Sequence, residues 1–129
     1  MATNRKKLGA WGEELARGYL EKLGFSFVAA NWTAMAGKRL GEIDLIMEKC
    51  DTLLFVEVKT RATPLFGPGE EAVSFFQKKK IKRAIDRFLF ENEKYAERFP
   101  RFDIVGVEML TLTPRFTHIE NVELGERSS

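Results

Sequence analysis

The chain has 129 residues, of which 44% are hydrophobic and 31% are charged. This length and composition predict one folded domain with its own core, and they exclude a disordered chain. Cys50 is the only cysteine and His118 the only histidine, which excludes an intramolecular disulfide and zinc sites built from several such ligands. The basic N-terminus is followed by no apolar signal core, and no apolar run approaches the roughly 18 residues of a membrane span, so we expect a cytoplasmic protein without a membrane partner.

The N-terminal half predicts one helix followed by three strands. Apolar residues recur at helical spacing over residues 5–23, and Gly24 is a typical helix end. Trp11 and Tyr19 belong to this apolar face, and we expect both in the core rather than as platforms for base stacking. A polar loop is predicted over 33–40. The strands are predicted over residues 25–31, 42–47 and 53–60, the last two forming a hairpin centred on Cys50–Asp51.

The C-terminal half predicts a second helix and two further strands. The helix begins at Ser74, which forms a capping box with Gln77, and it ends at the latest at Pro100. A helix of this length after the third strand permits a parallel crossover. We therefore predict a single α/β domain over residues 1–129, with a mixed sheet of about five strands flanked by two main helices. The last strands are predicted over 102–112 and 116–122, and frayed ends over 1–4 and 124–129.

The positive charge is concentrated in the second helix, although the net charge of the chain is only +2. Cations in the first turns of a helix oppose its dipole, and like charges four residues apart repel each other. This cost suggests a polyanionic partner, and we expect this face, together with the loop from Arg61 to Gly69, to contact DNA phosphates. The alternative is a solvated face without a partner. The proposed contacts are Arg61, Lys78, Lys79, Lys82 and Arg83.

Charged residues interrupt the two central strands. Glu57 and Lys59 stand two apart in an otherwise apolar strand, so their side chains share a face. In a hairpin symmetric about Cys50–Asp51, Asp44 lies opposite Glu57, and Glu42 opposite Lys59. Directly opposed side chains are about 5 Å apart, and two carboxylates at that distance require a cation or a proton between them.

The first helix contributes a third carboxylate, because Glu13 lies at the edge of the apolar stripe while Glu14 lies on the polar side. Glu13, Asp44 and Glu57 would form an all-oxygen site suited to Mg²⁺ or Mn²⁺. Such a site with Lys59 beside it suits phosphodiester hydrolysis. The alternative is a buried ion pair between Lys59 and either Glu57 or Glu42 that only stabilises the sheet.

Two segments, Gly41-Glu42-Ile43-Asp44-Leu45-Ile46 and Phe55-Val56-Glu57-Val58-Lys59-Thr60-Arg61, resemble the YraN-like family of small uncharacterised bacterial proteins. That family is similar to PD-(D/E)xK nucleases, which have the restriction-endonuclease-like fold, and especially to archaeal Holliday-junction resolvases. Further matches are Gly12-Glu13 with Ala16, Asn31, Phe66-Gly67, Ala72-Val73 and Arg101-Phe102-Asp103.

The resemblance implies a Mg²⁺- or Mn²⁺-dependent endonuclease acting on DNA, with branched or structured DNA as the favoured substrate. Glu13, Asp44 and Glu57 then correspond to the metal-binding acids and Lys59 to the motif lysine, with Glu42 and Gln77 in support. Where this chain has Gln77-Lys78, the family commonly has Lys-Gln, so one lysine is displaced along the helix.

A resolvase would need two active sites, which suggests a homodimer. Two other classes stay open: a nucleic-acid-binding protein that retains the nuclease fold without catalysis, and a protein-binding domain with a structural ion cluster.

Overall fold

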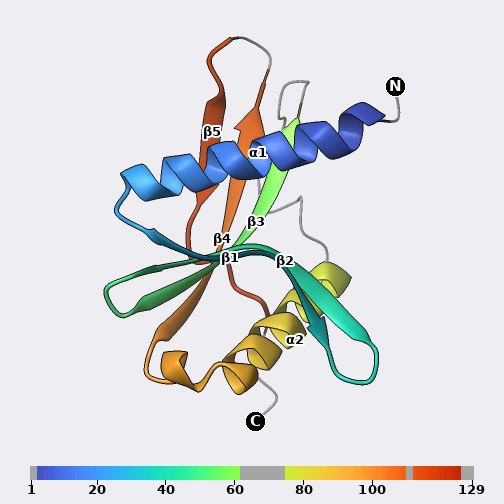
Figure 1. The fold of residues 1–129 in the computed structure, drawn as a ribbon, viewed down its shortest axis with the longest axis vertical. Coiled ribbons are helices and arrows are strands. Elements are labelled where there is room, and N and C mark those ends of the chain that lie inside the picture. Colours follow the sequence, from blue (N-terminus) through green and yellow to red (C-terminus); the bar gives the residue numbers. More distant parts are fainter. Residues whose placement is uncertain (1–2, 62–74, 110–111, 126–129) are drawn as a thin grey trace.

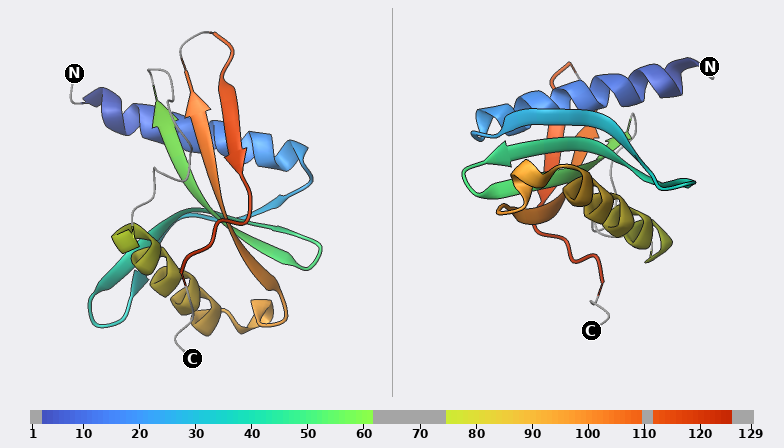
Figure 2. Two further views of the ribbon diagram at one scale, coloured as in Figure 1. Left: turned by 180° about the vertical axis from the view of Figure 1, so that it is seen from behind. Right: turned by 60° about the horizontal axis from the view of Figure 1, so that its bottom comes forward.

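The structure is a computed structural model that describes residues 3–61, 75–109 and 112–125. Within these ranges the chain forms a five-stranded sheet with one long helix on each face, as Figures 1 and 2 show. Neither of these two helices is long and apolar enough to cross a membrane. In chain order the elements are α1 (Thr3–Lys22), β1 (Ser26–Met35), β2 (Arg39–Lys49), β3 (Thr52–Arg61), α2 (Phe75–Glu91), the short 3-10 helix η2 (Glu93–Tyr95), β4 (Phe99–Glu108) and β5 (Arg115–Ile119).

The sheet is mixed, with the strands in chain order β1-β2-β3-β4-β5. Neighbouring strands are antiparallel except for β3 and β4, which are parallel and are connected through α2. The predicted α/β class and the parallel crossover are therefore confirmed. A parallel pair needs a long connection, because the chain must return to the end of the sheet at which the first strand began. The helix between β3 and β4 provides that connection.

The two helices cover two separate apolar clusters on opposite faces of the sheet. Leu54 and Val56 pack with α1, whereas Leu53 and Phe55 pack with α2. Strand β3 is thus buried on both sides, as its near-continuous apolar sequence predicts. After Thr52, which begins β3, four buried apolar residues follow, and the next polar residue is Glu57, where the burial of the strand decreases.

The predicted polar loop over residues 33–40 is wrong in its length. Strand β1 extends to Met35 and β2 begins at Arg39, so only a short turn separates them, with Gly37 at φ 74°. Pairing with β2 extends the strand through polar residues, because the ladder satisfies the backbone of Thr33 opposite Glu42.

Helix α2 ends at Glu91, before Pro100, as predicted. The bounds of the following strand differ from the prediction, because β4 begins at Phe99 and ends at Glu108 instead of spanning 102–112. Pro100 lies in β4 beyond the residues that pair with β5, so its missing N–H removes no hydrogen bond to β5. Leu124, expected to fray, packs against the cluster under α2. Ser74, the predicted cap, lies outside the described residues, as do both segments of the chain around Phe66-Gly67 and Ala72-Val73.

The prediction that Trp11 belongs to the core is wrong. Ala16 and Leu20 are buried under α1, and Tyr19 is half-buried, but Trp11 is 57% exposed. A helical wheel identifies an apolar stripe, but it does not show which length of the helix lies over the sheet. Here α1 crosses the sheet at an angle (Figure 1), and Gly12, not Trp11, is the residue of this turn that packs against β3.

Candidate functional site

The candidate site lies where β2 and β3 stop pairing. The predicted hairpin register is confirmed for the pairs from Leu45–Val56 to Lys49–Thr52. Beyond Leu45, the carboxylate of Asp44 takes the place of a backbone acceptor, because its Oδ2 accepts the N–H of Val58 at 2.8 Å. The strands separate at this point, and the separation makes room for side chains between them.

Asp44 and Glu57 meet in this gap, as predicted. The two carboxyl groups are hydrogen-bonded. Burial, followed by the charge of Glu57, raises the pKa of Asp44 to about 7, although the N–H of Val58 counteracts the shift. Near neutral pH Asp44 therefore holds a proton far more readily than an ordinary aspartate does, unless a cation replaces that proton.

Lys59 provides the positive charge beside the pair. Its Nζ lies 3.4 Å from Oε2 of Glu57, and both side chains are 18% exposed. The prediction that these two side chains share a face is confirmed. By strand alternation from Phe55, that face is the one that α2 covers.

Glu13 approaches Asp44 from the other helix. Burial and then the charge of Asp44 raise the pKa of Glu13, while a hydrogen bond from the Asn31 side chain opposes the shift. Gly12 explains why α1 comes so close: a Cβ atom at this position would lie 1.9 Å from Oγ1 of Thr60 in β3. The Gly12-Glu13 motif therefore combines a close helix–strand contact with the carboxylate that this contact positions.

Asp44 is reached from both faces of the sheet because the side-chain alternation of β2 breaks there. Ile43 packs in the cluster under α2, whereas Leu45, two residues later, packs under α1. The strand opposite, β1, is also irregular here, because Asn31 has φ 51°. Its neighbours Ala30 and Trp32 pair with Leu45 and Ile43. An asparagine tolerates this left-handed conformation better than most residues do. Asn31 is a site residue that sequence reasoning mentioned as a motif match but did not assign a role.

The donor set fits a hard divalent cation at Asp44 and Glu57, since both offer carboxylate oxygens next to each other. In the part of the chain that the structure describes, no three His, Cys, Asp or Glu side chains are already arranged to hold a metal ion. Asp44 is instead the shared member, with Glu57 on one side and Glu13 on the other. The predicted triad thus exists as two overlapping pairs.

The predicted contact between Glu42 and Lys59 is wrong. Glu42 is exposed, pairs with Thr33 in β1, and contacts Arg39 at 3.4 Å. The contact fails because β2 and β3 have separated before this point, and Lys59 pairs with Glu57 instead. Glu42 influences the site only through its charge, which contributes to the raised pKa of Asp44.

The basic part of α2 lies close to the candidate site. A Cβ atom on Gly41 would lie 2.7 Å from the backbone oxygen of Lys80, so α2 passes directly over the strand that carries Asp44. Arg61, at the end of β3, is exposed, as are Gln77 and three of the predicted α2 contacts. Lys78 is half-buried, and Lys82 is held by Asp86 at 2.7 Å. The exposed contacts on α2 are Lys79, Lys82 and Arg83.

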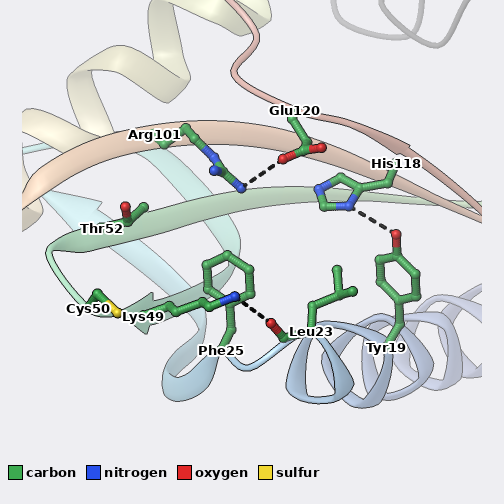
Figure 3. A pocket seen from close by; sticks show the side chains of 9 residues that line it. All are labelled: Tyr19, Leu23, Phe25, Lys49, Cys50, Thr52, Arg101, His118 and Glu120. Atoms are coloured by element: carbon green, nitrogen blue, oxygen red, sulfur yellow. Dashed lines mark hydrogen bonds and ion pairs between the residues drawn. The ribbon is translucent and has the colours of Figure 1, made fainter.

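A second polar cluster, which sequence reasoning missed, includes Tyr19 of α1 and His118 of β5 (Figure 3). Nδ1 of His118 lies 3.0 Å from the Tyr19 hydroxyl, and its Nε2 lies 2.7 Å from Oδ2 of the buried Asp103. Burial raises the pKa of Asp103, but hydrogen bonds from His118, Arg101 and the Asn121 N–H together hold it below its ordinary value. The sequence does not predict that His118 pairs with Asp103, because the two residues lie in different strands. The Arg101-Phe102-Asp103 motif is the one feature that singles out Asp103.

This cluster lines an open pocket of about 660 Å³, yet its groups are already paired with one another. Lys49 donates to the backbone oxygen of Leu23 at 2.7 Å, and Arg101 binds Asp103 through two hydrogen bonds. Burial, followed by the charges of Glu120 and Asp103, raises the pKa of the Tyr19 phenol, so it is no activated nucleophile. The cluster is best explained as a connection between α1 and β5.

Sequence comparisons place the chain among known proteins. A family model described as "Uncharacterised protein family UPF0102" matches residues 12–107, a range that contains all four predicted catalytic residues. The chain belongs to the UPF0102 family. The predicted YraN-like membership is thereby confirmed.

Relatives in this family match over most of their length. The UPF0102 protein of Alkaliphilus oremlandii is 38% identical over 117 residues, which cover 90% of this chain and 97% of that protein. The UPF0102 protein of Nocardia farcinica is 42% identical over 106 residues, covering 82% and 80%. The UPF0102 protein of Syntrophomonas wolfei is 38% identical over 118 residues, covering 90% and 96%.

Proposed function

We propose that this UPF0102 protein is a metal-dependent nuclease that hydrolyses phosphodiester bonds in DNA. The observation that carries the proposal is the hydrogen-bonded pair of Asp44 and Glu57 with the ammonium of Lys59 3.4 Å from Glu57. Two adjoining carboxylates in a partly buried gap are unfavourable for stability alone. They are what a divalent cation requires.

Each residue of the site has a distinct role in this proposal. Asp44 and Glu57 hold Mg²⁺ or Mn²⁺, and Glu13 supplies a third carboxylate from α1. When bound, such an ion polarises a phosphoryl oxygen and lowers the pKa of a bound water. Lys59 stabilises the negative charge that develops on the phosphate, or orients the attacking water.

DNA is the proposed substrate because the basic surface adjoins the site. Arg61 ends the same strand as Lys59, and the exposed Lys79 and Arg83 lie on the helix that crosses β2 at Gly41. A polyanion bound along this helix reaches the carboxylates at the end of β3. Branched or structured DNA is the favoured form. In this proposal the protein acts in the cytoplasm. It acts as a homodimer where two DNA strands must be cut, since each protomer supplies one site.

The test is cleavage of a DNA panel that contains a single strand, a duplex, a splayed fork and a four-way junction, with Mg²⁺ or Mn²⁺. We expect cleavage of at least one form by the wild type and a loss of about 100-fold or more in Glu57→Gln and Lys59→Ala. Asp51→Asn is the matched control, because Asp51 is an exposed carboxylate in the β2–β3 turn, at the other end of the hairpin from the site. If the metal-loaded wild type cuts no form of DNA or RNA, the proposed nuclease activity is refuted.

The second candidate function is DNA binding without catalysis. The observation that favours it is that no three acids among the described residues are arranged to hold a metal. In that case the wild type retains the branched DNA on a gel, Glu57→Gln retains it equally well, and neither protein cuts it with any metal.

A further inference from the structure

A second pocket, of about 540 Å³, lies beside the carboxylates between α1 and the β1–β2 hairpin. It shares two residues with the candidate site, Glu13 and Asn31. Its other walls include the acidic Glu14 together with aromatic, aliphatic and basic residues, and Trp11, Arg17 and Phe27 matter most for its chemistry. The pocket therefore adjoins the candidate site through Glu13, whose carboxylate interacts with Asp44.

The aromatic residues of this pocket are exposed. Trp11 is 57% exposed and Phe27 37%, and the guanidinium of Arg17 lies 3.8 Å from the centre of the Phe27 ring. Large aromatic side chains normally contribute to the core, as Trp32 does by packing edge-to-face on Phe88 at 5.1 Å. Other aromatic side chains of this chain are as exposed, so what distinguishes Trp11 and Phe27 is that they line a pocket beside the carboxylates.

The charges of the pocket select its occupant. Glu13 and Glu14 both line it, and Arg17 is the cation beside them. Negative charge therefore exceeds positive charge at the wall, which disfavours a phosphate or a carboxylate inside. A flat, neutral group with N–H donors fits better, because its face stacks on an indole and its amino groups donate to carboxylates. A nucleobase has both properties.

We propose that this pocket binds an unpaired nucleobase of the DNA strand whose backbone lies at the Asp44–Glu57 pair, with Trp11 as the stacking residue. The proposal rests on the proposed function. It specifies the substrate class: the strand must offer an unstacked base next to the reacting phosphate, as single-stranded segments and branch points do. An intact duplex cannot offer one without the energetic cost of unpairing.

The test uses tryptophan fluorescence in EDTA, where binding is measured without cleavage. Trp32 packs in the core, so a change on DNA binding reports Trp11, and Trp11→Phe supplies the signal of Trp32 alone. We expect a single-stranded oligonucleotide to quench the wild type, and the same sequence as a duplex to quench it much less. Trp11→Phe should show no quenching.

Affinity is measured on the same single strand by anisotropy of a labelled oligonucleotide. Trp11→Ala should bind roughly tenfold more weakly or worse, from the loss of one base stack. Phe99→Ala is the matched control, because Phe99 is an aromatic side chain of similar exposure (68%), paired with Thr52 at the other end of β3. It should bind within twofold of the wild type. Thermal melts of all variants establish that they fold.

Each result separates this inference from the proposed function. Metal-dependent cleavage with unchanged affinity in Trp11→Ala overturns the base pocket and leaves the nuclease standing. Quenching and Trp11-dependent affinity without any cleavage support the base pocket and count against the enzyme. Equal quenching of the Trp11 fluorescence by duplex and by single strand overturns the inference. Quenching that appears on raising the protein concentration without DNA also overturns it, because the pocket would then bind a second copy of the chain.

Discussion

At the scale of single residues, Asp44 is the group on which the account depends. Strand alternation predicted its position opposite Glu57 and the shared face of Glu57 and Lys59, because a period of two is a rigid property of strands. Alternation could not predict that the side-chain alternation of β2 breaks at Asp44. It also could not predict that Glu42 forms an ion pair with Arg39 and not with Lys59. Both depend on where the two strands separate, which is set by tertiary packing.

The raised pKa of Asp44 has a consequence for stability in the absence of metal. The pKa of about 7 in the folded state lies above the ordinary aspartate value of 3.8, so the folded state binds the proton more tightly than the unfolded state. Stability must therefore fall as pH rises from about 4 through 7. Asp44→Asn removes this effect.

We expect Asp44→Asn to be more stable than the wild type at pH 8 by on the order of 2–4 kcal/mol, and the difference to shrink toward pH 4. Urea denaturation in EDTA at pH 8 and pH 4.5 measures it. Asp51→Asn, the same change in the exposed turn of the hairpin, should shift stability little at either pH. A variant less stable than the wild type at pH 8 would contradict the assigned pKa.

At the scale of elements, two glycines determine how closely the helices approach the site. Gly12 brings α1 onto Thr60, and Gly41 brings α2 onto β2. The sequence showed both only as parts of motifs, since a glycine does not reveal which element will pass over it. For the same reason the apolar stripe of α1 was predicted correctly, while the burial of Trp11 was not.

Gly12→Ala should destabilise the protein by about 1–3 kcal/mol, because the added methyl group overlaps Thr60 and forces α1 to move. Gly18→Ala is the matched control in the same helix, since nothing lies within 4 Å of its added Cβ. That change should stabilise by about 0.5–1 kcal/mol through helix propensity. Chemical denaturation of both variants is the measurement.

Replacing Thr60 by Ala in the Gly12→Ala protein should restore part of the loss, since the atom in closest contact is then absent. Equal stability of Gly12→Ala and Gly18→Ala would show that α1 does not need the close approach.

At the scale of the whole molecule, the mixed sheet and its parallel crossover were predictable from the sequence of elements. The overall arrangement places a basic helix on one face and an aromatic pocket on the other, with the carboxylates between them. The connection between Tyr19, His118 and Asp103 joins residues far apart in sequence, and only the folded chain brings them together.

Binding of DNA along α2 should depend on salt through counterion release. Neutralising Lys79 and Arg83 together to Gln should reduce the slope of log K against log salt concentration by about 1–2, measured by anisotropy from 50 to 300 mM salt. Lys22 and Lys38, changed together to Gln, remove the same charge from exposed positions outside α2 and should leave the slope nearly intact. An equal reduction by both pairs would indicate attraction by net charge alone.

Binding of a divalent ion by Asp44 and Glu57 is the central claim, and Mn²⁺ titration followed by electron paramagnetic resonance at pH 8 tests it most directly. The wild type and Glu14→Gln should each take up one tightly held ion, and Asp44→Asn and Glu57→Gln should leave the metal free in solution at the same concentrations. The account would be contradicted if the two site variants took up as much Mn²⁺ as the wild type. It would also be contradicted if the wild type took up none.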